Sequence, residues 1–442
     1  MSNVLNLKPE DIDTPEKRSK YTLTIVGCSQ NGVLLSCSFA DAGFKVTCSD
    51  VDPTVTKKLS RGKTCFIDAE VEGKLKYQIS KGQLVITNDL KKATAKSDIV
   101  VVTLKPKVDE KKKVNTSELV GACRLVGAAL PEGALVIYSG VSGLGFVDGA
   151  LREAIEDTSG FKAGLGFGLA YVPFLDYGTH TTKSIADLGL KVAGVGERSL
   201  KAAVVILSTI AKTVKPLSNV RIAEVAKLFS LARRDADTAL ANELTVFCES
   251  AGVDYFEALK ALEIDDFKPS VTEEKAKDDS YLLLESAENI NAKLRLPTLA
   301  RQVNEEMVKH AVSLAQDALR DRGKTLRRAK VALLGPACRG TGELVKLLES
   351  KGANVTVFDQ DARKDTLELG AVKTNLNEAT EGADCVMVLA WTEQLKNINL
   401  KKLKALTKTP QVLVDLAGVF EPKEVEAEGF AYLGLGRGAR QK

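Results

Sequence analysis

The sequence predicts an α/β protein in which two parallel-sheet domains are joined by a central helical domain. Short apolar runs alternate with helical patterns in the first half of the chain, and the same alternation returns near Lys330. Such alternation is typical of parallel strands joined by crossover helices. The residues between these regions have helical spacing, and no glycine occurs between Gly252 and Gly323. We expect a polar tail over 1–20, sheet domains over 21–215 and 326–442, and a helical domain over 216–325.

The bulk composition is that of an ordinary globular protein. The chain has 442 residues, of which 44% are hydrophobic and 27% charged, and its formal net charge is +4. This charge is too small to indicate nucleic acid as a partner, and we interpret the lysine run over 105–113 as a solvated loop. No apolar run reaches the roughly 20 residues of a membrane span, and the polar start lacks an apolar signal core. We therefore expect a cytoplasmic protein with no membrane partner.

The cysteines and histidines do not predict a metal site. Eight cysteines are scattered along the chain without a C-x-x-C pair, which argues against zinc knuckles and against a disulfide scaffold. We expect them to be reduced, buried and apolar in character. The two histidines, His180 and His310, have no histidine partner at metal-ligand spacing.

The first sheet domain is expected to begin with the strand "LTIVG", a helix that stops at Gly43, and the strand "FKVTCSD". Further strands are "SDIVVVTL", "GALVIYSG" and "LKVAGV", and the last is followed by a helix over "RSLKAAVVILSTIAKTV". In the central domain a long helix is capped by Ser218 or Asn219 and ended by Gly252, and a second helix follows Pro297. From Lys330 the order strand, glycine-rich turn, helix, strand recurs, with two more strands in "DCVMVLAW" and "PQVLVDLAG".

The turn "VGCSQNG" after the first strand is close to the dinucleotide-binding pattern G-x-G-x-x-G. Gly27 permits the tight turn, Gly32 permits close packing of helix on strand, and Asp50 ends the next strand at about the spacing of a ribose-binding acid. Ser29 stands at the second glycine, where its hydroxyl can donate to a phosphate. These residues predict a Rossmann-like domain that binds NAD through Gly27, Ser29, Gly32 and Asp50. The alternative is a sheet of the same type that binds no nucleotide.

Four segments together resemble the nucleotide-sugar 6-dehydrogenases, the UDP-glucose/UDP-N-acetylmannosamine dehydrogenase family. The first is the turn with its acid, and the second is the helix from Ala223, with Glu224, Lys227 and the pair Asn242 and Glu243. The third is "PTLARQVNEEMVKH", and the fourth comprises "GADCVMVLAWTEQLKNINL" and "GFAYLGLGRG". The resemblance implies two Rossmann-like domains, a homodimer through the central helices, and a nucleotide or nucleotide-sugar ligand.

The family oxidises an alcohol to an acid in two NAD-dependent steps, and the second step needs a nucleophilic cysteine. The resemblance implies that Lys227 stabilises the oxyanion and that Asp278 replaces the family aspartate. The cysteine loop G-G-x-C-x-P-x-D is replaced by a segment over 264–296 that contains no cysteine, with Glu274 in register with the nucleophile.

Other family positions also differ. Leu231 replaces the asparagine one turn after the lysine, and Ala417 replaces the substrate arginine. Both glutamates of the P-E-F-L-R-E-G motif are absent from the segment over 172–178. The family loop S-T-V-P-P-G-T near the nicotinamide is altered over 139–145, and the F-K-P-x-T-x-D segment is shortened to "CRGTG".

Three interpretations follow. The favoured one is a pseudoenzyme, a non-catalytic dinucleotide-binding homodimer with a regulatory or assembly role. The second is an NAD-dependent oxidoreductase that transfers a single hydride, with Lys227 as base. The third is a true UDP-sugar 6-dehydrogenase. Whether the chain is an enzyme at all therefore stays open on the sequence.

Overall fold

The structure is a computed structural model that describes residues 3–64, 69–109, 111–173, 185–187, 189–264, 267–272, 277–335, 339–359 and 371–437. The chain forms two compact units. The first comprises Met1–Ser230 with Tyr281–Ala292, and the second comprises Leu231–Ser280 with Lys293–Lys442. The expected α/β class, with two Rossmann-like sheets and a central helical region, is confirmed. The three domain boundaries expected from the sequence stay a prediction.

The first unit is built on an eight-stranded sheet with the strand order β10-β9-β8-β7-β4-β1-β2-β3. All neighbouring strands are parallel except β8 and β9, which are antiparallel. Its strands are β1 Thr22–Val26, β2 Lys45–Ser49, β3 Leu84–Thr87, β4 Ile99–Val102, β7 Leu135–Tyr138, β8 Gly168–Tyr171, β9 Gly189–Gly194 and β10 Thr213–Pro216. A short antiparallel hairpin joins β5 Lys107–Val108 to β6 Val114–Asn115.

Helices cover both faces of this sheet because its strands are apolar on both sides, as parallel strands are. Ile25 of β1 packs in the core on the side of α2 (Gln30–Asp41), α4 (Ala69–Ser80) and α8 (Glu197–Leu207). Val26 faces the other core, with α6 (Ser117–Gly127) and α7 (Arg152–Ser159). Shorter helices are α1 Pro15–Arg18, α3 Pro53–Leu59 and α5 Leu90–Thr94.

The second unit contains an all-parallel sheet with the strand order β13-β12-β11-β14-β15-β16. Its strands are β11 Lys330–Leu334, β12 Asn354–Phe358, β13 Val372–Lys373, β14 Cys385–Val388, β15 Val412–Asp415 and β16 Ala431–Gly434. One face packs on α12 (Arg295–Arg320) and α13 (Arg339–Ser350). The other face packs on α14 Leu376–Thr380, α15 Glu393–Lys396, α16 Leu400–Leu406 and α17 Pro422–Ala427.

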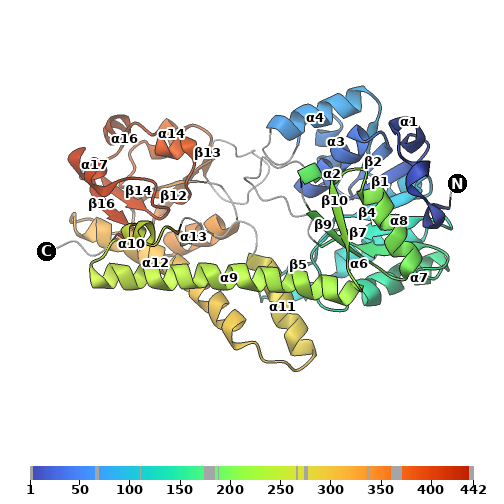
Figure 1. Cartoon of the computed structure of the whole chain (residues 1–442). Helices are drawn as coiled ribbons and strands as arrows, with labels where there is room; N and C mark the ends of the chain where they lie inside the picture. Colours follow the sequence, from blue (N-terminus) through green and yellow to red (C-terminus); the bar gives the residue numbers. More distant parts are fainter. Residues whose placement is uncertain are drawn as a thin grey trace. The chain divides into compact units, whose positions relative to one another are not determined.

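Helix α9 (Val220–Ala251) is continuous and is the longest element in Figure 1. The side chain of Asn219 accepts a hydrogen bond from the backbone of Ile222, and Gly252 follows the helix with φ +70°, so both expected ends are confirmed. Helices α10 (Tyr255–Ala261) and α11 (Lys277–Asn289) follow. The helix expected over 198–214 was too long, because α8 ends at Leu207 and Thr213–Pro216 form the edge strand β10.

No helix in the described part of the chain combines the length and the apolar character that crossing a membrane requires.

A buried ion pair joins α9 to α12 inside the second unit. The Arg301 Nη1 atom lies 2.5 Å from the Asp235 Oδ1 atom, and both side chains are almost wholly buried. The Asn304 amide donates to the same carboxylate oxygen at 2.9 Å. Removing one partner of such a pair leaves a buried charge uncompensated, which costs far more than an exposed pair contributes.

We therefore predict that Arg301→Ala lowers the free energy of unfolding of the second unit by about 3–5 kcal/mol. The single tryptophan, Trp391, lies in this unit, so its fluorescence during urea unfolding reports the change. Arg233→Ala is the matched control because Arg233 pairs with Asp237 on the exposed side of α9, and we expect little change there. Equal losses for the two variants would contradict the prediction.

Candidate functional site

The turn between β1 and α2 has the geometry that a dinucleotide-binding turn requires. Gly27 has φ +103°, a backbone conformation that favours glycine. A Cβ atom on Gly32 would lie 1.9 Å from the Gly27 carbonyl oxygen, so no side chain fits at that position. The two glycines predicted from the sequence therefore have distinct roles. Gly27 sets the turn, and Gly32 permits the close approach of α2.

Ser29, the departure from the glycine pattern, is accommodated as the N-cap of α2. Its φ of −64° and ψ of 174° are open to any residue, so the turn has no need of a glycine here. The backbone of Gly32 donates to the Ser29 Oγ atom at 3.4 Å. The side chain is thus turned toward the helix end, and the positive end of the α2 dipole stays directed at the turn.

Asp50 is fixed beside the same turn. Its carboxylate accepts hydrogen bonds from the backbone of Cys28 at 2.7 Å and of Asp52 at 3.0 Å. A carboxylate held at the end of the second strand binds ribose hydroxyls and repels a 2′-phosphate, so it favours NAD over NADP. The residues present fit NAD: Gly27, Ser29 and Gly32 would hold the pyrophosphate, and Asp50 would hold the ribose.

The loop after β7 lies at the carboxyl edge of the same sheet, where α/β folds bind their ligands. The hydroxyl of Tyr138 donates to the Val141 carbonyl oxygen at 2.9 Å. A Cβ atom on Gly140 would lie 2.3 Å from the Leu104 carbonyl oxygen, so the loop turns here only with glycine. The backbone of Leu144 donates to the hydroxyl of Ser286 on α11 at 3.0 Å. The loop therefore has little freedom to rearrange.

Glu224 on α9 holds the far end of this loop. Its side chain is fully buried and accepts hydrogen bonds from the backbone of Gly145 at 2.7 Å and of Val147 at 2.9 Å. Burial raises the pKa of Glu224, while the two donated hydrogen bonds act in the opposite direction. In the sequence, Glu224 is marked by its place in the helix motif that begins at Ala223. The signal it carried was an acid in an otherwise apolar stretch, "IAEVAKLF".

Lys227 follows Glu224 by one helical turn on the buried face of α9. Only 5% of its surface is exposed, an unusual burial for a lysine. Leu231, one further turn along and the predicted counterpart of the family asparagine, is apolar and only 2% exposed. Of the other predicted site residues, Asp278 falls within helix α11, but its side chain lies outside the described residues, as does all of Glu274.

Asn242 belongs to a separate polar network inside the second unit. Its amide nitrogen donates to the Ser270 carbonyl oxygen at 3.2 Å, and its amide oxygen accepts from the Ser270 backbone at 2.9 Å. The same nitrogen donates to Asn304 at 2.9 Å. Asn242 therefore holds the backbone at Ser270, whereas Glu243 is exposed. The partner Ser270 was missed because nothing in its local sequence marks it.

In the second sheet, Asp415 marks the end of β15. It is fully buried and accepts hydrogen bonds from the backbone of Ala417 at 3.1 Å and of Phe420 at 2.9 Å. Burial is the main cause of its raised pKa. Ala417, the predicted counterpart of the family arginine, contributes a backbone donor to this turn.

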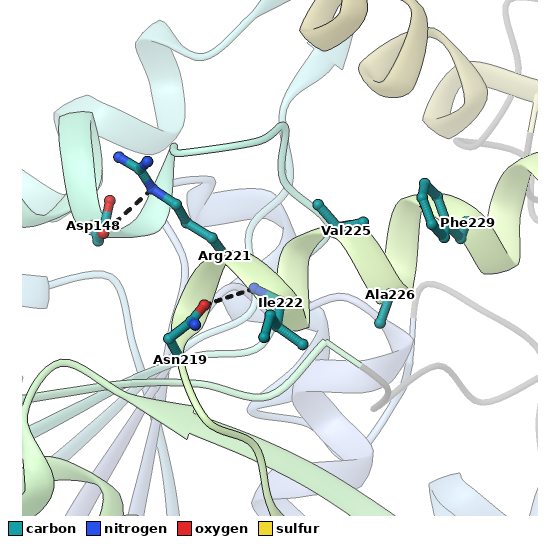
Figure 2. Close-up of a pocket in the computed structure, with 7 residues that line it drawn as sticks. All are labelled: Asp148, Asn219, Arg221, Ile222, Val225, Ala226 and Phe229. Atoms are coloured by element: carbon teal, nitrogen blue, oxygen red, sulfur yellow. Dashed lines mark hydrogen bonds and ion pairs between the residues drawn. The ribbon is translucent and has the colours of Figure 1, made fainter.

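A hollow of about 560 Å³ lies in the first unit beside the N-terminal part of α9 (Figure 2). Arg221 faces Asp148 at one end, with 3.8 Å between the Nε and Oδ2 atoms. Its other side chains are mainly apolar: Ile222, Val225, Ala226 and Phe229, together with Asn219. None of the predicted NAD-binding residues lines it.

The turn, the acid and the sheet order together define an NAD-binding Rossmann domain followed by a second Rossmann-like domain. The chain belongs to the UDP-glucose/GDP-mannose dehydrogenase family. Residues 21–207 match its NAD binding domain, residues 221–306 its central domain and residues 341–422 its UDP binding domain.

Similar proteins span nearly the whole chain. UDP-N-acetyl-D-mannosamine dehydrogenase of Pyrococcus horikoshii is 24% identical over 431 residues, covering 94% of this chain and 99% of the relative. UDP-glucose 6-dehydrogenase of Rhizobium meliloti is 23% identical over 441 residues, with 94% and 99% covered. The solved structure of the Pyrococcus horikoshii UDP-D-ManNAc dehydrogenase has a TM-score of 0.83 at 23% identity and covers 94% of this chain and 99% of its own. The shared fold thus extends through both units.

We predict that Glu224→Gln changes how stability depends on pH. Because the pKa of Glu224 is raised above the ordinary 4.5, its contribution to stability is present below that pH and is lost as pH rises through the raised value. Glutamine does not titrate, so the variant lacks this slope, which amounts to at most about 1.4 kcal/mol per pH unit. Urea unfolding followed by circular dichroism at several pH values measures it.

Glu243→Gln is the control, since Glu243 lies on the same helix but is exposed. An identical pH dependence in wild type and Glu224→Gln would contradict the assignment of a raised pKa.

Proposed function

We propose that this protein binds NAD and a nucleotide sugar as a homodimer without performing the four-electron oxidation of its family, so that it acts as a pseudoenzyme. One observation carries the proposal. The segment over 264–296, where the family nucleophile stands, contains no cysteine. Without a thiol the aldehyde intermediate has no group on which to form the thiohemiacetal that releases the second hydride.

Three of the other described cysteines are poorly suited to replace this nucleophile. Cys248, the nearest in sequence, is 9% exposed and packs with Tyr255 and Leu259. Burial raises the pKa of its thiol, which lowers the fraction of reactive thiolate. Cys123 and Cys385 are likewise buried, and burial raises the pKa of each to about 12.

A single hydride transfer is the second candidate, and the burial of Lys227 favours it. Only 5% of its surface is exposed, so its amine lies inside the unit, where a base could act on a bound substrate. It shares a helix face with Glu224, which fixes the loop after β7. Hydride transfer to NAD needs only a bound cofactor and a base, so the missing cysteine does not prevent it.

The experiment titrates the purified protein with NAD by calorimetry and then follows NADH absorbance with a panel of UDP-sugars. We expect NAD binding without turnover. One NADH per sugar, lost in Lys227→Ala but kept in the exposed control Lys215→Ala, would favour the second candidate. Two NADH per sugar would indicate a true 6-dehydrogenase and would contradict both the pseudoenzyme and the single hydride transfer. Absence of NAD binding would overturn the cofactor assignment itself.

The homodimer part of the proposal is supported by an apolar stripe on α9. Ile222, Phe229, Leu240, Leu244 and Phe247 recur at helical spacing, and each is at least 40% exposed. Five large apolar side chains along one helix face call for a covering surface. The hollow in Figure 2 shares Ile222 and Phe229 with this stripe, so it offers a second copy a concave apolar contact.

We predict that Phe247→Glu converts the dimer to a monomer. Phe247 is 66% exposed in one chain, and a glutamate at this position would carry a charge into the interface. Sedimentation velocity at micromolar concentration measures the change. Arg234→Glu introduces a glutamate at an exposed position of α9 outside the stripe and should remain dimeric. A monomeric wild type, or dissociation by both variants, would contradict this interface.

A further inference from the structure

Two cysteines lie in contact beneath the cofactor turn. The Sγ atoms of Cys28 and Cys48 are 3.1 Å apart, roughly 1 Å more than the bonding distance of about 2.05 Å. Both side chains are in the core below α2, with 3% and 0% of their surfaces exposed. Cys37 belongs to the same core cluster but makes no such sulfur contact among the residues that the structure describes. The Cys28–Cys48 pair is therefore distinct from ordinary cysteine packing.

The pair joins the two segments on which NAD binding depends. Cys28 stands in the turn itself, and its backbone donates to the Asp50 carboxylate at 2.7 Å. Cys48 lies in β2, two residues before Asp50. The turn is further tied to this strand by the Gly27 backbone, which donates to the Ser49 carbonyl oxygen at 2.8 Å. A bond between the sulfurs would pull the turn toward β2 and shift the donors that hold Asp50.

We propose that Cys28 and Cys48 form a reversible disulfide that weakens NAD binding. The oxidant is a peroxide. One thiolate attacks a peroxide oxygen, and the O–O bond breaks with loss of water to leave a sulfenic acid. The second thiolate then attacks that sulfur, the S–O bond breaks, and a second water leaves. Two thiols and one hydrogen peroxide thus give one disulfide and two waters, and a dithiol reductant reverses the change.

The burial of the pair couples its oxidation to cofactor binding. Because neither thiol is open to solvent in the closed turn, peroxide reaches them only when the turn opens locally. Bound NAD holds the turn closed and therefore protects the thiols. By linkage, a protein that binds NAD more weakly when oxidised is also harder to oxidise when NAD is bound.

The test uses the full chain, first reduced and then treated with hydrogen peroxide. Remaining thiols are blocked, the protein is digested, and mass spectrometry identifies the linked peptides. We expect a Cys28–Cys48 link, a Kd for NAD at least tenfold higher after oxidation, recovery with dithiothreitol, and slower linking in the presence of NAD. The absence of this link, or a link that leaves the Kd unchanged, would overturn the proposal.

Matched variants separate the pair from general oxidative damage. Cys48→Ala should keep the same Kd with and without peroxide, whereas Cys37→Ala, in the same core cluster, should respond as wild type does. Loss of binding by oxidised Cys48→Ala would overturn the proposal, and if this variant fails to fold, the wild-type link and Kd decide alone.

The inference rests on NAD binding by the reduced protein. Failure of the reduced protein to bind would overturn the cofactor assignment and the switch together, whereas normal reduced binding with an unchanged oxidised Kd overturns only the switch.

Discussion

The buried carboxylate of Glu224 holds the loop at the carboxyl edge of the sheet in the first unit. Its two oxygens accept hydrogen bonds from the backbone N–H groups of Gly145 and Val147, so one side chain on α9 fixes this loop. A carboxylate removed from water is costly, and the two hydrogen bonds offset part of that cost. Together with the hydrogen bond from Leu144 to Ser286, this anchor orders the loop after β7. Lys227, one turn along the same helix, is also buried.

The cofactor turn shows why a departure from a motif need not remove its function. The pattern G-x-G-x-x-G records backbone demands, and only two of the three positions make those demands here. Gly27 has φ +103° and Gly32 has no room for a Cβ atom, whereas Ser29 has an ordinary extended backbone. The parts of the site that depend on backbone geometry are therefore present. The parts that depend on particular side chains, the thiol and the asparagine, are the ones that the sequence predicts to be replaced.

Much of the fold could be predicted from the sequence because periodicity and caps are local. The ends of α9 were predicted through Asn219 and Gly252, and the strand before the turn through its apolar run. Three side chains, those of Glu224, Ser286 and Asn242, each accept a hydrogen bond from a backbone group that is distant in sequence. Their partners could therefore not be predicted. The end of α8 was misplaced for a related reason, because Thr213–Pro216 gains its strand conformation only by pairing with β9.

Binding and chemistry are separable in this scaffold, and that separation supports the pseudoenzyme proposal. In the proposed binding mode NAD is held by the turn, Asp50 and the α2 dipole, all within one sheet domain. The second oxidation of the family needs a thiol, and the segment over 264–296, where that thiol is expected, contains no cysteine. Loss of that thiol leaves the turn, the acid and the sheet unchanged, so a chain can lose its four-electron reaction and keep its ligands. A thiol pair beneath the turn, at Cys28 and Cys48, then acts on binding rather than on catalysis.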